Sequence, residues 1–111
     1  MARMKVFDQY KLPKTVVRIV RAQCADYERR EQAIRNTVLL PEIEDSYKRT
    51  NAIIRDALMP CEEQLRKDIL NDIADCRGYD KSRTALTISY HAYYRRKMKA
   101  IFDIAKKLHL I

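Results

Sequence analysis

The sequence predicts an all-helical protein, and three observations carry that prediction. Its 111 residues include one glycine and three prolines, so the tight hairpin turns of a β-protein are nearly excluded. Charged residues make up 34% of the chain, which suits helices with long solvated faces. Apolar residues recur at helical spacing along most of the sequence. We expect a long N-terminal amphipathic helix, two middle helices and a C-terminal helix-turn-helix.

The first predicted helix runs from Lys14 to about Leu39, with Pro13 at its start, where the missing amide costs nothing. Its apolar stripe comprises Val16, Val20, Cys24, Tyr27, Ile34 and Val38. A helix this long in a short chain often packs against a partner. We therefore predict that residues 1–60 form a helical extension with a candidate homodimer surface along residues 16–38. Use of the same stripe in the chain's own core is the alternative.

Pro41 and Pro60 divide the middle of the chain into two further predicted helices. The first runs from about Glu42 to Met59 and begins with acidic residues, which suit the positive end of a helix dipole. The second begins at Glu62–Glu63, and Gly78 ends it with a residue that takes a left-handed cap without strain. Its predicted buried face consists of Leu65, Ile69, Leu70, Ile73 and Cys76.

The positive charge of the chain is concentrated in its last third. Residues 1–76 hold 14 lysines and arginines against 13 acidic residues, whereas residues 77–111 hold nine against two. A local field of this sign favours polyanions, because binding releases their condensed counterions. A merely solvated basic segment is the alternative.

The pattern after Gly78 predicts a helix-turn-helix within residues 61–111. Asp80 suits the N-cap of a short helix from Lys81 to Leu86, and Thr87–Ile88 leaves room for a tight turn only. Ser89 suits the N-cap of a longer helix from Tyr90 to about Leu108. The apolar stripe of that helix comprises Tyr94, Met98, Ile101, Ala105 and Leu108.

The recognition helix of such a motif presents its first turns to the major groove of duplex DNA. Tyr90, His91 and Arg95 are expected nearest the bases, because they lie close to the helix start. Lysines suit the DNA backbone or solvent, and Ser82 and Arg83 suit phosphate contacts. The predicted DNA-binding residues are Ser82, Arg83, Ser89, Tyr90, His91, Arg95, Arg96, Lys97 and Lys99.

Residues 88–110 resemble the C-terminal part of phage late-transcription regulators of the RinA/ArpU type. The resembling residues are Ile88–Ser89, AYYRRKMKAI at 92–101 and IAKKLHL at 104–110. More distantly, the segment is similar to the sigma-factor region that reads a promoter's upstream element, and residues 12–34 look like the family's opening helix. The resemblance implies a phage or prophage transcription regulator that binds specific duplex DNA in the bacterial cytoplasm, with RNA polymerase as a candidate partner.

Other protein classes fit the sequence less well. No apolar run is long enough to cross a bilayer, so no membrane role is expected. His91 has no cysteine or carboxylate at a ligand spacing, and no glycine-rich phosphate loop is present, so we expect no metal, no cofactor and no enzyme. Cys24, Cys61 and Cys76 form no CxxC pair, and their odd number suits free thiols in a reducing compartment. A helical protein–protein interaction module and a phage packaging or recombination accessory protein remain as alternatives.

Overall fold

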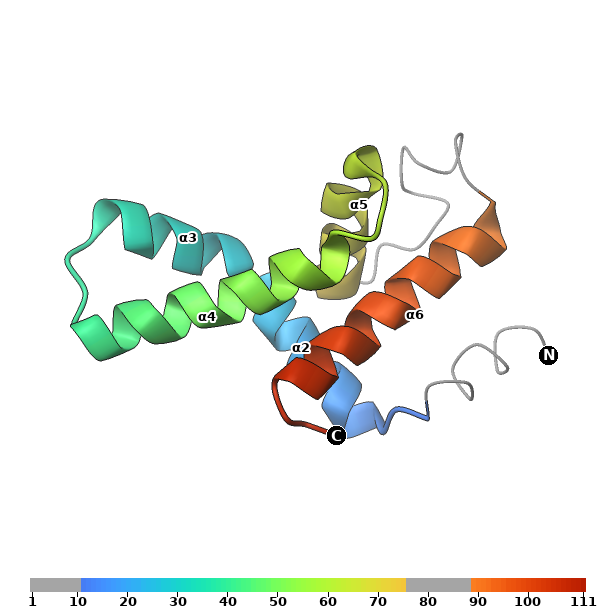
Figure 1. Cartoon of the computed structure of the whole chain (residues 1–111), viewed down its shortest axis with the longest axis horizontal. Helices are drawn as coiled ribbons and strands as arrows, with labels where there is room; N and C mark the ends of the chain where they lie inside the picture. The colour runs from blue at the N-terminus through green and yellow to red at the C-terminus, as the bar shows by residue number, and fades with distance from the viewer. Residues whose placement is uncertain (1–10, 76–88) are drawn as a thin grey trace.

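The computed structural model describes residues 11–75 and 89–111, which form five α-helices and no strand. This confirms the all-helical prediction for the described part of the chain. The helices are α2 (Lys14–Ala25), α3 (Tyr27–Asn36), α4 (Pro41–Leu58), α5 (Glu63–Asp75) and α6 (Tyr90–Lys107). Figure 1 shows α3 and the first half of α4 as a hairpin that extends to one side of the molecule. The other helices gather around the second half of α4.

One hydrophobic core lies where α2, α4, α5 and α6 meet. Val20, Ile54 and Ile104 come from three of these helices, and each is fully buried. Burial of such side chains stabilises a fold by about 1.5–3 kcal/mol each relative to their exposure. The core takes side chains from both predicted units, 1–60 and 61–111, so the described helices of the two units pack together.

The prediction of one continuous helix over 14–39 is wrong, because the chain bends at Asp26 and α3 ends at Asn36. The Asp26 backbone leaves helical geometry at φ −93° and ψ 1°. Its carboxylate accepts hydrogen bonds from Arg29 Nη2 at 2.6 Å and from Arg30 at 3.3 Å. The carboxylate lies at the start of α3, where a negative charge suits the helix dipole. No glycine or proline marks the bend, so the sequence did not show it.

Arg30 is 3% exposed and fastens this bend to α4. Its Nη2 donates to the backbone carbonyl of Gln23 at 2.6 Å, and its Nε donates to the Asn51 side-chain oxygen at 2.6 Å. The Asn51 amide in turn donates to the Tyr27 carbonyl at 3.2 Å and to a Glu31 carboxylate oxygen at 3.0 Å. A buried guanidinium is costly unless its donors are satisfied, so this network holds α3 against α4 in one register.

The apolar stripe of the first predicted helix is divided between the core and the solvent. Val16, Val20 and Cys24 on α2 are buried in the chain's own core, and burial raises the pKa of the Cys24 thiol to about 12. Tyr27 packs partly against that core, whereas Val38 lies beyond α3 and is fully exposed. The α2 part of the predicted dimer surface therefore packs internally.

The bounds of the remaining described helices agree closely with the predictions. Pro41 occupies the first position of α4, where a backbone amide would have no hydrogen-bond partner within the helix. Ser89 caps α6 as expected, and its hydroxyl accepts a hydrogen bond from the Ala92 amide at 3.2 Å. Cys76, Gly78, the short helix predicted at 81–86 and the turn at 87–88 lie outside the described residues.

Candidate nucleic-acid interface

One side of helix α6 packs in the hydrophobic core, and the other side carries basic residues. Its buried side is wider than the predicted stripe, since it also includes Tyr93, Ala100 and Ile104. Tyr94 and Leu108 of the predicted stripe are only partly buried and pack on the edge of the core. The buried residues of α6 are Tyr93, Met98, Ala100, Ile101, Ile104 and Ala105.

The solvent side of α6 carries His91, Arg95, Lys99 and Lys106, which we call the outward row. All four residues are exposed. Their spacings of four, four and seven residues place them along one side of the helix. At about 1.5 Å per residue the outward row is about 22 Å long. It is therefore a straight, solvent-facing line of basic groups on a helix whose other side is fixed in the core.

One cation of the outward row forms an ion pair with a carboxylate of α6 itself. Lys99 pairs with Asp103 across one turn, with its Nζ at 2.7 Å from the carboxylate. An exposed pair at this spacing is worth only about 0.3–0.5 kcal/mol, so Asp103 holds the Lys99 side chain weakly. Arg95 and Lys106 form no ion pair with a described residue.

The start of α6 presents an aromatic group beside this row. The Tyr90 side chain is 38% exposed, and its ring lies 4.7 Å from the ring of Tyr94 and 5.7 Å from that of His91. Ser89 is exposed at the N-cap, where the first amides of a helix favour an anion. Tyr90 and His91 thus lie in the first turn of α6, and Arg95 follows one turn after His91 on the exposed side.

Arg96, another predicted DNA-binding residue, is turned toward the segment before α5. Its Nη2 lies 2.6 Å from a carboxylate oxygen of Glu62, and its Nη1 donates to the Ala92 carbonyl at 3.3 Å. The hydrogen bond from Arg96 lowers the pKa of Glu62 below its usual range. Arg96 is thus engaged in holding α6 beside α5.

Lys97 is engaged more deeply, in a buried cluster with Asp72 and Tyr93. The Asp72 carboxylate is 1% exposed, accepts the Tyr93 hydroxyl at 2.6 Å and pairs with Lys97 Nζ at 3.1 Å. Burial, followed by the hydrogen bond to Asp72, raises the pKa of Tyr93 well above its usual range. The Lys97 side chain is only 13% exposed, so this predicted site residue serves to connect α5 to α6.

Sequence reasoning gave little weight to a second basic row, which lies on α2. Lys14, Arg18 and Arg21 follow each other at spacings of four and three, and Lys14–Ala25 contains no acidic residue. These three side chains form no ion pair with a described residue. The absence of acidic residues from Lys14–Ala25 is the feature of the sequence that could have identified this row. Of the other predicted site residues, Ser82 and Arg83 lie outside the described ranges.

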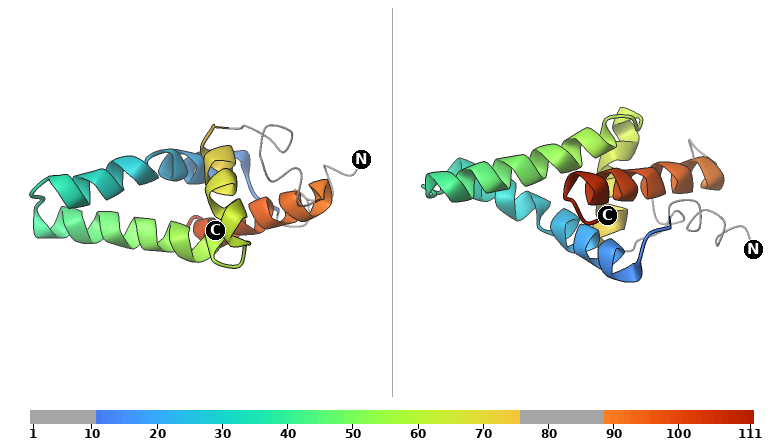
Figure 2. Two further views of the ribbon diagram at one scale, coloured as in Figure 1. Left: turned by 90° about the horizontal axis from the view of Figure 1, so that it is seen from above. Right: turned by 60° about the horizontal axis from the view of Figure 1, so that its bottom comes forward.

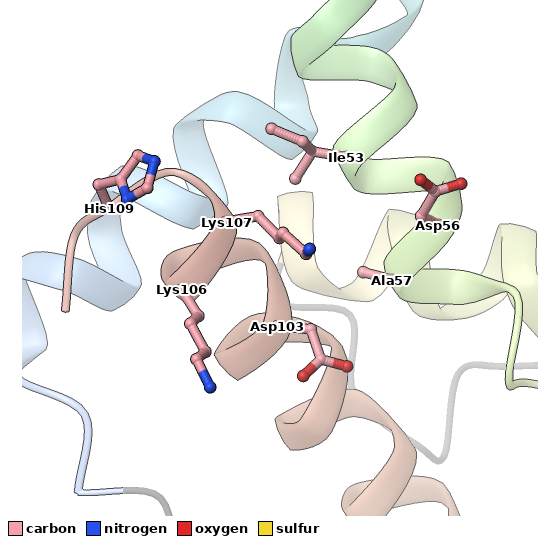
Figure 3. A pocket seen from close by; sticks show the side chains of 7 residues that line it. All are labelled: Ile53, Asp56, Ala57, Asp103, Lys106, Lys107 and His109. Atoms are coloured by element: carbon pink, nitrogen blue, oxygen red, sulfur yellow. The ribbon is translucent and has the colours of Figure 1, made fainter.

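A pocket of about 840 Å³ opens between α4 and the end of α6. Figure 3 shows Lys107 reaching into the space between the helices, whereas Lys106 points away from α4. Asp56 and Asp103 lie at the same opening as Lys107 and His109. Because carboxylates and cations are mixed there, the pocket has no clear preference for an anion, and we leave it outside the candidate interface.

The comparisons with known proteins add no further evidence. No family model matches the chain, and neither a curated protein nor a solved structure matches it. Within residues 11–75 and 89–111, no group of three histidine, cysteine or acidic side chains is arranged to hold a metal ion. No helix in these ranges is long and apolar enough to span a bilayer.

Proposed function

We propose that the chain binds duplex DNA along the outward row of α6 and acts as a sequence-specific transcription regulator of phage or prophage type. The observation that carries the proposal is the row itself: Arg95, Lys99 and Lys106 face solvent along one side of a helix anchored in the core. A helix of this kind fits the major groove, which is wide enough to admit it. The resemblance of residues 88–110 to late-transcription regulators supports the same conclusion.

The outward row divides into groups suited to different parts of the duplex. Arg95 and His91 lie near the N-terminal end, where a recognition helix meets base edges, and arginine bonds well to the O6 and N7 atoms of guanine. Lys99 and Lys106 lie further along and suit backbone phosphates, which fix orientation without reading sequence. Arg96 and Lys97 are assigned to the stability of the fold, because carboxylates of the chain already hold them.

A charge-matched pair of variants tests this assignment. The first carries Arg95→Gln, Lys99→Gln and Lys106→Gln, and the second carries glutamines in place of the α2 row (Lys14, Arg18 and Arg21). Both lose three positive charges at solvent-facing or partly exposed sites. Affinity is measured by fluorescence anisotropy with a labelled duplex at about 50 mM salt, where phosphate contacts are strong.

The proposal expects the α6 variant to lose at least about tenfold in affinity, which corresponds to 1.4 kcal/mol, and the α2 variant to lose much less. Equal losses would show that binding follows net charge alone and would remove α6 from the interface. Circular dichroism of both variants checks that the helices remain folded.

Regulation of transcription is separated from other DNA-binding roles by a different assay. A packaging or recombination accessory protein would bind DNA without changing transcription from a late promoter. A reporter driven by such a promoter in a bacterial host is expected to respond to the wild-type chain and not to the α6 variant. Recovery of the host RNA polymerase in a pull-down with the chain would support direct contact with the polymerase.

The alternative function is that of a helical protein–protein interaction module that binds no nucleic acid. The internal pairing of Arg96 and Lys97 favours it, since two of the basic residues of α6 are then structural rather than available to a polyanion. Absence of duplex binding at low salt would favour this alternative over DNA binding.

A further inference from the structure

The tip of the α3–α4 hairpin exposes apolar side chains that the core does not use. We call residues 35–45 the hairpin tip. Val38 is 100% exposed, Leu40 is 64% exposed and Ile43 is 39% exposed. None of the three belongs to the hydrophobic core or packs against it. Single exposed apolar residues are common on protein surfaces, but three of them within six positions form a patch.

No other described helix lies near this patch. In both views of Figure 2 the hairpin tip is at the far end of the molecule from α5 and α6. Figure 1 shows the same separation from the side. Arg30 and Asn51, which form a buried hydrogen bond between α3 and α4, lie further along the hairpin from the tip. Val38 is therefore fully exposed to water, and Leu40 is mostly exposed.

Charges of both signs surround the patch. Arg35 lies in the last turn of α3, and Glu42 and Asp45 lie at the start of α4. None of these three side chains forms an ion pair with a described residue, whereas Glu44 pairs with Lys48 at 3.7 Å. The only hydrogen bond of the Arg35 side chain among the described residues goes to the Glu31 backbone carbonyl at 3.4 Å. The hairpin tip thus has a basic edge on one helix and an acidic edge on the other.

We propose that the hairpin tip is a self-association surface and that its occupant is the hairpin tip of a second copy of this chain. In a two-fold dimer the same patch meets itself, so a patch must carry its own complement. Val38 and Leu40 would lie at the centre against their equivalents. Arg35 would face the partner's Glu42 and the partner's Asp45, and the symmetry would repeat that contact.

The arrangement of charge favours a second copy over other occupants. The acidic edge repels a polyanion or an anionic membrane surface, because like charges in contact are unfavourable. A partner that is strongly acidic or strongly basic would place like charges against one of the two edges of the tip. A second copy satisfies both edges at once and covers the apolar residues between them.

The experiment measures the oligomeric state of the full chain by sedimentation velocity from about 5 to about 500 μM, a range that spans micromolar dissociation constants. One variant carries Arg35→Glu, and a second carries Glu42→Lys with Asp45→Lys. Each variant alone places like charges together at both copies of the contact. Mixed in equal amounts they restore both contacts, because the glutamate at position 35 meets the two lysines and the native Arg35 meets the native acidic pair.

The proposal expects the wild-type chain to form dimers within this range. It expects each variant alone to raise the dissociation constant by at least about tenfold, and the mixture to recover most of the loss. Val38→Ser with Leu40→Ser should weaken the dimer without changing the helical content, because both residues are exposed. Arg18→Glu on α2 is the matched control and should leave association unchanged.

Three outcomes would overturn the proposal: a wild-type chain that stays monomeric throughout the range, variants that associate as the wild type does, or a mixture that stays monomeric. Because no hairpin-tip variant alters α6, each can also be tested for duplex binding at low concentration. The dimer proposal and the DNA proposal therefore fail independently.

Discussion

The buried contact of Asp72 with Tyr93 and Lys97 allows a quantitative prediction for stability. Asp72 and Tyr93 are almost completely buried, and the hydroxyl lies 2.6 Å from the carboxylate. A hydrogen bond to a charged group contributes about 1.5–3 kcal/mol. We therefore expect Tyr93→Phe to lower the free energy of unfolding by about that amount.

Replacement of the carboxylate should cost more. Asp72→Ala leaves the Tyr93 hydroxyl without the acceptor that it has 2.6 Å away and leaves the Lys97 ammonium, on a side chain only 13% exposed, without its counterion. Removal of one partner of a buried ion pair costs about 3–5 kcal/mol. A domain of this size is stable by roughly 5–15 kcal/mol, so the variant is expected to fold with a much reduced urea midpoint. Asp72→Asn keeps the shape of the side chain, removes its charge and should fall between the two other variants.

The assay is equilibrium urea unfolding followed by far-UV circular dichroism. The double variant Tyr93→Phe with Asp72→Ala should lose about 1–2 kcal/mol less than the sum of the two single losses, because the residues share one contact. Additive losses, or a Tyr93→Phe variant within about 0.5 kcal/mol of the wild type, would refute the reasoning.

Three further predictions follow from the described contacts. The pKa values of Asp26 and Glu62 are lowered by hydrogen bonds from their partner arginines. The stability that these carboxyls contribute should therefore be present above their unfolded pKa values near 4 and should be lost as the pH falls through the lower folded values. The urea midpoint, measured between about pH 6 and pH 2, should fall over this range, and Glu62→Gln should reduce that fall. Cys24, whose thiol pKa is raised to about 12 by burial, should resist alkylation at about pH 8 in the folded chain and react when urea is added, as peptide mass spectrometry would show; rapid native labelling would contradict its burial. Asn51→Ala should lower the free energy of unfolding by about 1–3 kcal/mol, since the buried Arg30 loses an acceptor, and a neutral effect would remove this network from the account.

The sequence was sufficient for features that depend on local chemistry. Ser89 predicted the start of α6 because serine suits a capping position, and Pro41, expected to separate two helices, lies one residue before the predicted start of α4 at Glu42. The apolar spacing of Leu65, Ile69 and Ile73 predicted the buried side of α5. Each of these features is determined by a few neighbouring residues.

Features that depend on tertiary contacts were not predictable in the same way. The bend at Asp26 lies in an uninterrupted helical pattern and is held by Arg30, whose acceptor Asn51 comes from another helix. Arg96 and Lys97 look as available as Arg95 in the sequence, because their carboxylate partners lie 34 and 25 residues away. Helical periodicity identified a basic helix, but only the packing of α5 separated its inward cations from its outward ones.

The salt dependence of duplex binding tests the central claim most directly. If Lys99 and Lys106 each meet one phosphate while Arg95 meets a base, the logarithm of the binding constant should fall against the logarithm of salt concentration with a slope of about −1.8. Replacement of either lysine by glutamine should make that slope shallower by about 0.9, whereas Arg95→Gln should weaken binding with little change of slope. Undetectable binding at low salt, or a slope unchanged by both lysine replacements, would contradict the assignment of the outward row of α6 to DNA.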